Sequence, residues 1–192
     1  IVTSDVLVPR PETETLVDAI INENLQGKTL LELGTGSGVI SISIAQENKD
    51  CFIYATDISI KSILVAKQNA AKFFCENIIF LNHDWNNEWL FPQVDYLISN
   101  PPYVDKEATT GREEGIWFEP EKALFSKDRG LSDLKSILSK GKNFLTENGK
   151  VYLEHAPDQY EELNKFAVEN GYLNFSNLND LNGDKRVSIY QC

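Results

Sequence analysis

The order of the apolar segments limits the fold most strongly. Short apolar runs rich in β-branched residues alternate with longer segments in which apolar residues recur at helical spacing. That alternation predicts an α/β fold of βαβ units, a mostly parallel sheet with helices on both faces. We expect seven strands at 29–33, 52–56, 78–82, 95–99, 151–155, 173–178 and 186–191, and helices at 12–25, 37–47, 59–75, 130–147 and 157–170. Asn182–Gly183 is typical of a hairpin turn, so the last strand is expected to run antiparallel.

Two later segments carry further expectations. Residues 104–130 show little periodicity and are expected to form a long functional loop or lid after the fourth strand. In the helix expected over 130–147, one apolar stripe is predicted to face the core: Leu131, Leu134, Ile137, Leu138 and Leu145. The whole chain of 192 residues is expected to form one domain, residues 1–192.

A glycine-rich turn follows the first expected strand. In "LLELGTGSGVI", Gly34, Gly36 and Gly38 stand where a tight turn lets the backbone approach a ligand closely. The alternative is a turn with a purely structural role. Val39 occupies the place of the third glycine in a dinucleotide fingerprint, which disfavours a nicotinamide cofactor. Asp57 ends the second strand roughly 20 residues beyond the turn, where a carboxylate meets ribose hydroxyls, so an adenosine-containing ligand is indicated.

Three further side chains narrow the identity of that ligand. Glu32 beside the turn would repel a pyrophosphate but favour an ammonium or sulfonium group, and S-adenosylmethionine carries both. After the third strand, Asp84 is placed to accept from an adenine amino group, and Trp85 to cover the ring face. Packing in the core is the alternative role for Trp85. All these residues follow strands at the carboxyl edge of the sheet, where open α/β sheets bind ligands.

The stretch "SNPPY" ends the fourth strand with two prolines that cannot continue it. It is either a strand terminator or a site that needs hydrogen-bond acceptors without donors. The side-chain oxygen of Asn100 and the carbonyl of Pro101 would each take one N–H of a planar NH₂ group, leaving its nitrogen lone pair aimed at a methyl carbon on sulfur. Pro102 adds an apolar wall, and Tyr103 flanks the substrate group.

Composition excludes several classes of function. The three cysteines are odd in number without metal-ligand spacing, and the two histidines are far apart, so we expect a reduced, cytoplasmic protein without a bound metal. No apolar run approaches the ~20 residues that span a bilayer, so no membrane association is expected. The formal net charge of −11 repels a phosphate backbone, so direct binding to nucleic acid is disfavoured.

The motifs together resemble the HemK/PrmC family, the protein-(glutamine-N5) methyltransferases of peptide-chain release factors. The resemblance runs through nearly all of the chain and rests on "VLVPRPETETLV", "LLELGTGSGVI", "ATDIS", "HDW", "SNPPYV", "FEPEKALF", "RGLSDLKSIL" and "DLNGDKR". "NPPY" alone is shared with DNA adenine and some RNA methyltransferases, whereas its combination with "PRPETE" is more specific. The resemblance implies a class I, Rossmann-like methyltransferase fold with S-adenosylmethionine as cofactor and a release factor as partner.

The resemblance also implies roles for individual residues. Cofactor contacts fall on Gly34, Thr35, Gly36, Ser37, Gly38, Asp57, Trp85 and Asn100. The glutamine of a Gly-Gly-Gln tip would be held by Asn100, Pro101, Pro102 and Tyr103. A family motif near the substrate mouth matches Arg10, Pro11, Glu12 and Thr13, for which a proline-started helix is the alternative.

Two features depart from the family's pattern. Ala156, two residues after Glu154, stands where the family usually has glycine. This difference is expected to affect the local backbone conformation more than the chemistry of the site. Family members also carry a small helical domain before "VLVPRPETE" that helps grip the release factor, and this chain is expected to lack it. We therefore expect cofactor binding to survive and affinity for the protein substrate to be poor. The alternatives are an adenine-N6 nucleic-acid methyltransferase, which the same acceptors would serve, and a non-catalytic cofactor-binding interaction module.

Overall fold

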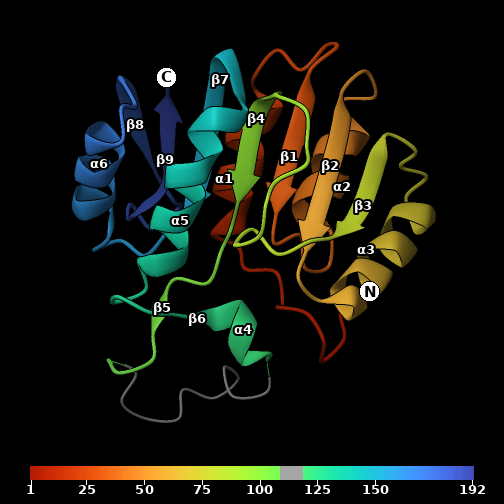
Figure 1. Cartoon of the computed structure of the whole chain (residues 1–192). Coiled ribbons are helices and arrows are strands. Elements are labelled where there is room, and N and C mark those ends of the chain that lie inside the picture. The colour runs from red at the N-terminus through yellow and green to blue at the C-terminus, as the bar shows by residue number, and fades with distance from the viewer. Residues whose placement is uncertain (109–118) are drawn as a thin grey trace.

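The fold is built on one seven-stranded sheet, seen in a computed structural model that describes residues 1–108 and 119–192. The strand order is β3-β2-β1-β4-β7-β9-β8 (Figure 1). The strands are β1 (Thr29–Leu33), β2 (Phe52–Asp57), β3 (Ile78–Asn82), β4 (Val94–Ser99), β7 (Leu145–Glu154), β8 (Asn174–Asn179) and β9 (Lys185–Gln191). Neighbours from β3 to β7 pair in parallel, whereas β9 is antiparallel to both β7 and β8. This order confirms the predicted fold class and the antiparallel last strand.

Helices cover both faces of the sheet. In Figure 1, α1 (Thr13–Ile21) and α2 (Val39–Glu47) lie behind the sheet and α5 (Ser132–Gly141) lies in front. The helix α3 (Ile60–Lys72) packs beside α2, and α6 (Tyr160–Glu169) packs beside α5. Central parallel strands are apolar on both faces because both are covered: Leu30 packs toward α1 and α2, and Leu31 toward α5. Among the described residues, no helix has the length and apolar character needed to cross a membrane.

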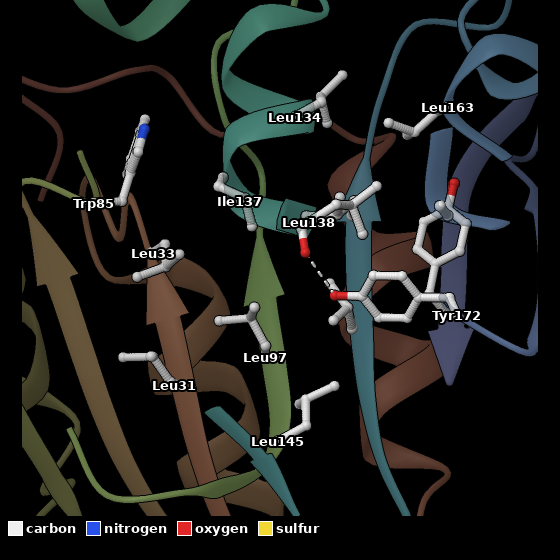
Figure 2. Packing of buried hydrophobic residues seen from close by; sticks show 14 of the residues in the cluster. Leu31, Leu33, Trp85, Leu97, Leu134, Ile137, Leu138, Leu145, Leu163 and Tyr172 are labelled. Carbon is white, nitrogen blue, oxygen red and sulfur yellow. Dashed lines mark hydrogen bonds between the residues drawn. The ribbon is translucent and has the colours of Figure 1, made fainter. Parts of the chain in front are cut away.

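The apolar stripe of α5 forms one half of the core. Figure 2 shows Leu134, Ile137 and Leu138 of this helix facing the sheet, and all three are fully buried. The hydroxyl of Tyr172 donates a 2.9 Å hydrogen bond to the carbonyl of Leu138. Leu145 belongs to the same core, but its predicted place in the helix is wrong. The helix ends at Gly141, and a short 3₁₀ turn over Lys142–Phe144 leads into β7, where Leu145 pairs with Val94.

A second, two-stranded sheet lies beyond the carboxyl end of β4. It pairs β5 (Val104–Asp105) in parallel with β6 (Phe125–Ser126), and the short helix α4 (Glu121–Leu124) precedes β6 (Figure 1). The prediction of a long loop over 104–130 is therefore wrong at both ends of that segment, which form strands and a short helix. Residues 109–118, its middle, lie outside the described residues.

Candidate active site

Two cavities meet at the carboxyl edge of the sheet. The first has a volume of about 790 Å³ and is bordered by the glycine turn after β1, the residues after β2, Trp85, and the segments 4–7 and 119–123. The second has a volume of about 330 Å³ and lies beside Arg10, Pro101 and Tyr103. Asn100 lines both cavities. A ligand in each would therefore meet at Asn100.

Glycine is required at the turn that borders the first cavity. Gly34 and Gly36 have φ angles of 76° and 55°, in the left-handed region that favours glycine. A Cβ atom on Gly34 would lie 3.3 Å from the Trp85 ring, so the missing side chain lets the indole approach the turn. A Cβ atom on Gly36 would meet nothing within 4 Å, because this residue borders the cavity. The predicted close approach of backbone to ligand is therefore sterically available here.

The other residues of the turn lie beneath it. Thr35 and Ser37 are buried, and neither they nor Gly38 lines either of the two cavities described above. Gly38 precedes α2 with a φ of 84°, and a Cβ atom there would lie 2.9 Å from Ile42 Cδ1. These three residues shape the turn, and their predicted contact with a cofactor stays a prediction.

Glu32 is buried below the same turn. Its Oε2 accepts a 2.7 Å hydrogen bond from the Thr35 hydroxyl and a second from the Ser41 hydroxyl. Its Oε1 is buried without a hydrogen-bond partner among the described residues. Burial raises the pKa of Glu32 to about 7. Glu32 does not line either cavity, so its predicted effect on a cationic ligand would act through the turn.

Asp57 ends β2, as predicted, and it lines the first cavity. Its Oδ2 accepts from the Gly36 N–H at 2.9 Å, and its Oδ1 accepts from the Ser59 N–H at 2.8 Å. Burial raises the pKa of this carboxyl group. Each ionised carboxylate oxygen can accept more than one hydrogen bond, so ribose hydroxyls could still bind. Asp57 therefore holds the glycine turn in place and faces the ligand space.

Trp85 and Asp84, predicted as a pair, take different places. Trp85 lines the first cavity, and its indole N–H donates to Asp133 Oδ1 at 3.3 Å. The Lys140 ammonium group of α5 donates to the Trp85 carbonyl at 2.8 Å and links the same segment to that helix. Asp84 lines neither cavity, and its Oδ1 accepts from the Asn86 N–H at 2.8 Å. The predicted contact of Asp84 with adenine therefore stays a prediction.

The Asn-Pro-Pro-Tyr corner separates the two cavities. The Asn100 NH₂ group donates to the Thr13 hydroxyl oxygen at 3.1 Å, which leaves the side-chain oxygen of Asn100 as its acceptor end. Pro102 lines the first cavity and Pro101 the second. In residues 1–108 and 119–192, the Pro101 carbonyl accepts no hydrogen bond. The predicted role of these two acceptors in holding a primary amide stays a prediction.

Glu154 lies under this corner, and sequence reasoning missed it as a site residue. The Tyr103 hydroxyl donates to Glu154 Oε1 at 3.0 Å, and the carboxyl group is fully buried. Burial raises the pKa of Glu154, while the nearby Thr13 and Tyr103 hydroxyls act in the opposite direction. The available signal was a carboxylate at the end of an apolar strand, the same signal that identified Asp57. Ala156, where the family has glycine, has no positive φ, so alanine causes no strain there.

An ion pair stands at the mouth of the second cavity. Arg10 lines this cavity and pairs with Glu119 at 2.6 Å. The Val8 N–H also donates to Glu119, at 3.2 Å, so the N-terminal segment is held against the chain before α4. Pro11 and Glu12 line neither cavity, and Glu12 occupies the N-cap position of α1 without a side-chain capping hydrogen bond. Sequence reasoning missed Glu119 and the segment 4–7.

The first cavity fits S-adenosylmethionine in size and chemistry. A volume of about 790 Å³ falls within the usual range for small-molecule sites. The open space at Gly36 accepts a close-lying ligand, and the carboxylate of Asp57 suits ribose hydroxyls. In its ionised form, the Glu32 carboxylate beneath the turn would favour a positive charge above it.

Comparisons with known proteins agree with these features. The family model described as the methyltransferase small domain matches residues 11–117. A release factor glutamine methyltransferase of Shewanella oneidensis is 33% identical over 98% of this chain and 66% of its own length. One from Aliivibrio fischeri is 33% identical over 99% of this chain and 68% of its own length. The chain therefore spans about two thirds of the length of these relatives.

The fold agrees with a solved structure as well. A methyltransferase from Pyrococcus furiosus superposes with a TM-score of 0.71 at 18% identity, covering 97% of this chain and 84% of that one. This likeness concerns the fold alone, whereas the curated relatives establish kinship. The family predicted from the motifs is confirmed: the chain belongs to the release factor glutamine methyltransferases.

Proposed function

We propose that this chain transfers the methyl group of S-adenosyl-L-methionine to the side-chain amide nitrogen of a glutamine in a peptide-chain release factor. The observation that carries the proposal is the place of Asn100. It lines both cavities, and its NH₂ group is engaged by Thr13, so its oxygen is left to accept from a substrate amide. The names of the relatives supply the substrate class, and a role in translation implies a cytoplasmic location.

The acceptor pair addresses the low reactivity of an amide nitrogen. Its lone pair is delocalised into the carbonyl group, so the nitrogen must be oriented and its conjugation weakened. The Asn100 side-chain oxygen and the Pro101 carbonyl each take one N–H, which turns the lone pair toward the first cavity. As the nitrogen gains positive charge, both hydrogen bonds strengthen, and the transition state is stabilised more than the bound substrate.

The step balances without a dedicated catalytic base. S-Adenosyl-L-methionine supplies a methyl group made electrophilic by the positive sulfur. The substrate nitrogen forms the new bond to carbon while the carbon–sulfur bond breaks and its electron pair stays on sulfur. The extra N–H proton then leaves to water, since an alkylated amide nitrogen is strongly acidic. Asp57 binds the ribose, and Trp85 forms a wall of the adenosine space.

The test offers three acceptors to the protein with methyl-labelled cofactor: a release factor with its Gly-Gly-Gln sequence, the same protein with that glutamine changed to alanine, and adenine-containing DNA. We expect label only in the first. Asn100→Ala should lower turnover at least ~10²-fold while cofactor affinity changes little. Asn24→Ala, at an exposed position outside the helices and strands, is the matched control. Label in DNA alone would favour the adenine methyltransferase, and label in none the non-catalytic module.

A further inference from the structure

The acceptor corner after β4 has few donors of its own to hold it in place. β4 ends at Ser99, which pairs with Leu33 of β1 and Leu153 of β7. The Ser99 hydroxyl also donates to the Leu33 carbonyl at 2.7 Å. Pro101 and Pro102 follow, and neither has an N–H with which to bond a neighbouring segment. The backbone that carries the Pro101 carbonyl must therefore be positioned from its two ends.

Tyr103 forms the far end of this corner, and two buried side chains hold it. Its carbonyl oxygen accepts from the Gln159 NH₂ group at 2.9 Å, and its hydroxyl donates to Glu154 Oε1 at 3.0 Å. Gln159 is 5% exposed, and Glu154 is fully buried. Neither of them lines a cavity described above, so both act on the site through Tyr103. The backbone and the side chain of Tyr103 are thus fixed by separate hydrogen bonds.

The Gln159 side chain joins three segments of backbone. Besides the bond to Tyr103, its NH₂ group donates to the Arg129 carbonyl at 3.0 Å, and its oxygen accepts from the Ala156 N–H at 2.9 Å. Gly130 makes this approach close, because a Cβ atom there would overlap the Tyr103 carbonyl oxygen. Two N–H donors and one acceptor at this reach are what a glutamine side chain offers. The amide of Gln159 therefore uses both of its ends to fix the surroundings of Tyr103.

We propose that Gln159 is a positioning residue that, by holding the Tyr103 carbonyl, fixes the Pro101 carbonyl where the substrate amide donates to it. This inference rests on the proposed function, because it concerns the second of the two acceptors for the same amide. Ser99 in the sheet and Tyr103 at Gln159 are fixed points on either side of the prolines, whose own φ angles have little freedom. Misplacing a reacting group by about 1 Å can cost about 10²-fold in rate, so loss of this hold should be visible in turnover.

The first test compares Gln159→Met and Gln159→Glu with the wild type. Methionine keeps the length of Gln159 but makes none of its three bonds, whereas an ionised glutamate keeps the acceptor for Ala156 and loses both donations. Each variant should lower kcat for the release factor at least about tenfold. KM should change by less than about threefold, because the acceptor acts on the reacting amide in the transition state. Cofactor affinity should also stay within about threefold, since neither Gln159 nor Tyr103 lines the first cavity.

Asn77→Leu is the matched control that separates positioning from simple stability. The Asn77 NH₂ group also donates to two backbone carbonyls, those of Asn48 at 3.1 Å and Cys51 at 3.0 Å, just before β3 at the opposite edge of the sheet. Its urea midpoint should fall about as far as that of Gln159→Met, while kcat per cofactor site, counted by calorimetry, stays near wild type. Wild-type kcat in Gln159→Met or Gln159→Glu, or an equal loss in Asn77→Leu, would overturn the inference. Gln159→Glu decides the question should Gln159→Met not fold.

Amide hydrogen exchange, followed by mass spectrometry, tests the hold on the corner without any substrate. Exchange in the peptide that covers 100–106 should be faster in Gln159→Met than in the wild type, and unchanged in Asn77→Leu. Equal exchange in the wild type and Gln159→Met would refute the hold. A wild-type protein that leaves glutamine unmethylated would refute the proposed function, and the exchange measurement would still decide whether Gln159 fixes the corner.

Discussion

Three glycines with similar backbone angles should respond differently to alanine, which separates ligand binding from folding. Gly27, Gly36 and Gly38 have φ angles of 69°, 55° and 84°. A Cβ atom meets nothing within 4 Å at Gly27 or Gly36, but at Gly38 it would lie 2.9 Å from the Ile42 side chain. Only Gly36 borders the first cavity. The three variants therefore share backbone strain and differ in what surrounds the new methyl group.

The expected magnitudes follow from these surroundings. Left-handed geometry costs an alanine about 1 to 2 kcal/mol, so Gly27→Ala and Gly36→Ala should each lose that much free energy of unfolding. Gly38→Ala should lose about 2 to 5 kcal/mol, because overpacking against α2 and α3 adds to the strain. Gly36→Ala should also weaken cofactor binding at least about tenfold, since the methyl group enters the space of the ligand. Gly27→Ala should leave that affinity unchanged.

Urea denaturation measures the first effect and isothermal titration calorimetry with S-adenosyl-L-methionine the second. Gly27→Ala is the control for strain, because it has the same open surroundings away from the site. Equal cofactor affinity in Gly27→Ala and Gly36→Ala would refute the assignment of the first cavity to the cofactor. Equal stability of Gly36→Ala and Gly38→Ala would refute the packing argument for Gly38.

Three further predictions concern charged residues. Burial raises the pKa of Glu32 from 4.5 to about 7, so the folded protein favours the protonated form. The contribution of Glu32 to the free energy of unfolding is therefore full below about pH 4.5. It falls by on the order of 3 kcal/mol as the pH rises to about 7. Glu32→Gln should flatten this part of the curve of urea midpoint against pH, and an unchanged slope would contradict the burial argument. Asp57→Ala should weaken cofactor binding in calorimetry, and unchanged affinity would contradict the ribose assignment. Arg10→Ala should raise KM for the release factor and leave the cofactor Kd unchanged. The free energy of unfolding should fall by at most about 1 kcal/mol, because the Arg10 side chain is 38% exposed. An unchanged KM would exclude Arg10 from the substrate mouth.

The sequence predicted those parts of the fold and site that depend on local chemistry. The Asn182–Gly183 turn joins β8 and β9 as expected, with Gly183 at a φ of 89°. Asp57 ends β2 and Asn100 follows β4, and both line the first cavity because parallel strands bring their carboxyl ends to one edge. Leu145 was misplaced because an apolar residue after a helical stripe suits the core equally well from a helix or from a strand.

Long-range pairing accounts for what the sequence did not reveal. Arg10 and Glu119 are 109 residues apart, and nothing local in either segment indicates the other. Glu154 gains its place because β7 pairs with β4, which brings its carboxylate within 3.0 Å of the Tyr103 hydroxyl, 51 residues earlier in the chain. Many strands end in a charged side chain, so the sequence alone does not show which residue each of them contacts. The folded structure is needed to identify these partners.

The most direct test of the account is tandem mass spectrometry of a release factor incubated with this protein and S-adenosyl-L-methionine. We expect a single added methyl group on the side-chain nitrogen of the glutamine in the Gly-Gly-Gln sequence, and none with Asn100→Ala. A methyl group on any other residue, or equal methylation by Asn100→Ala, would contradict it.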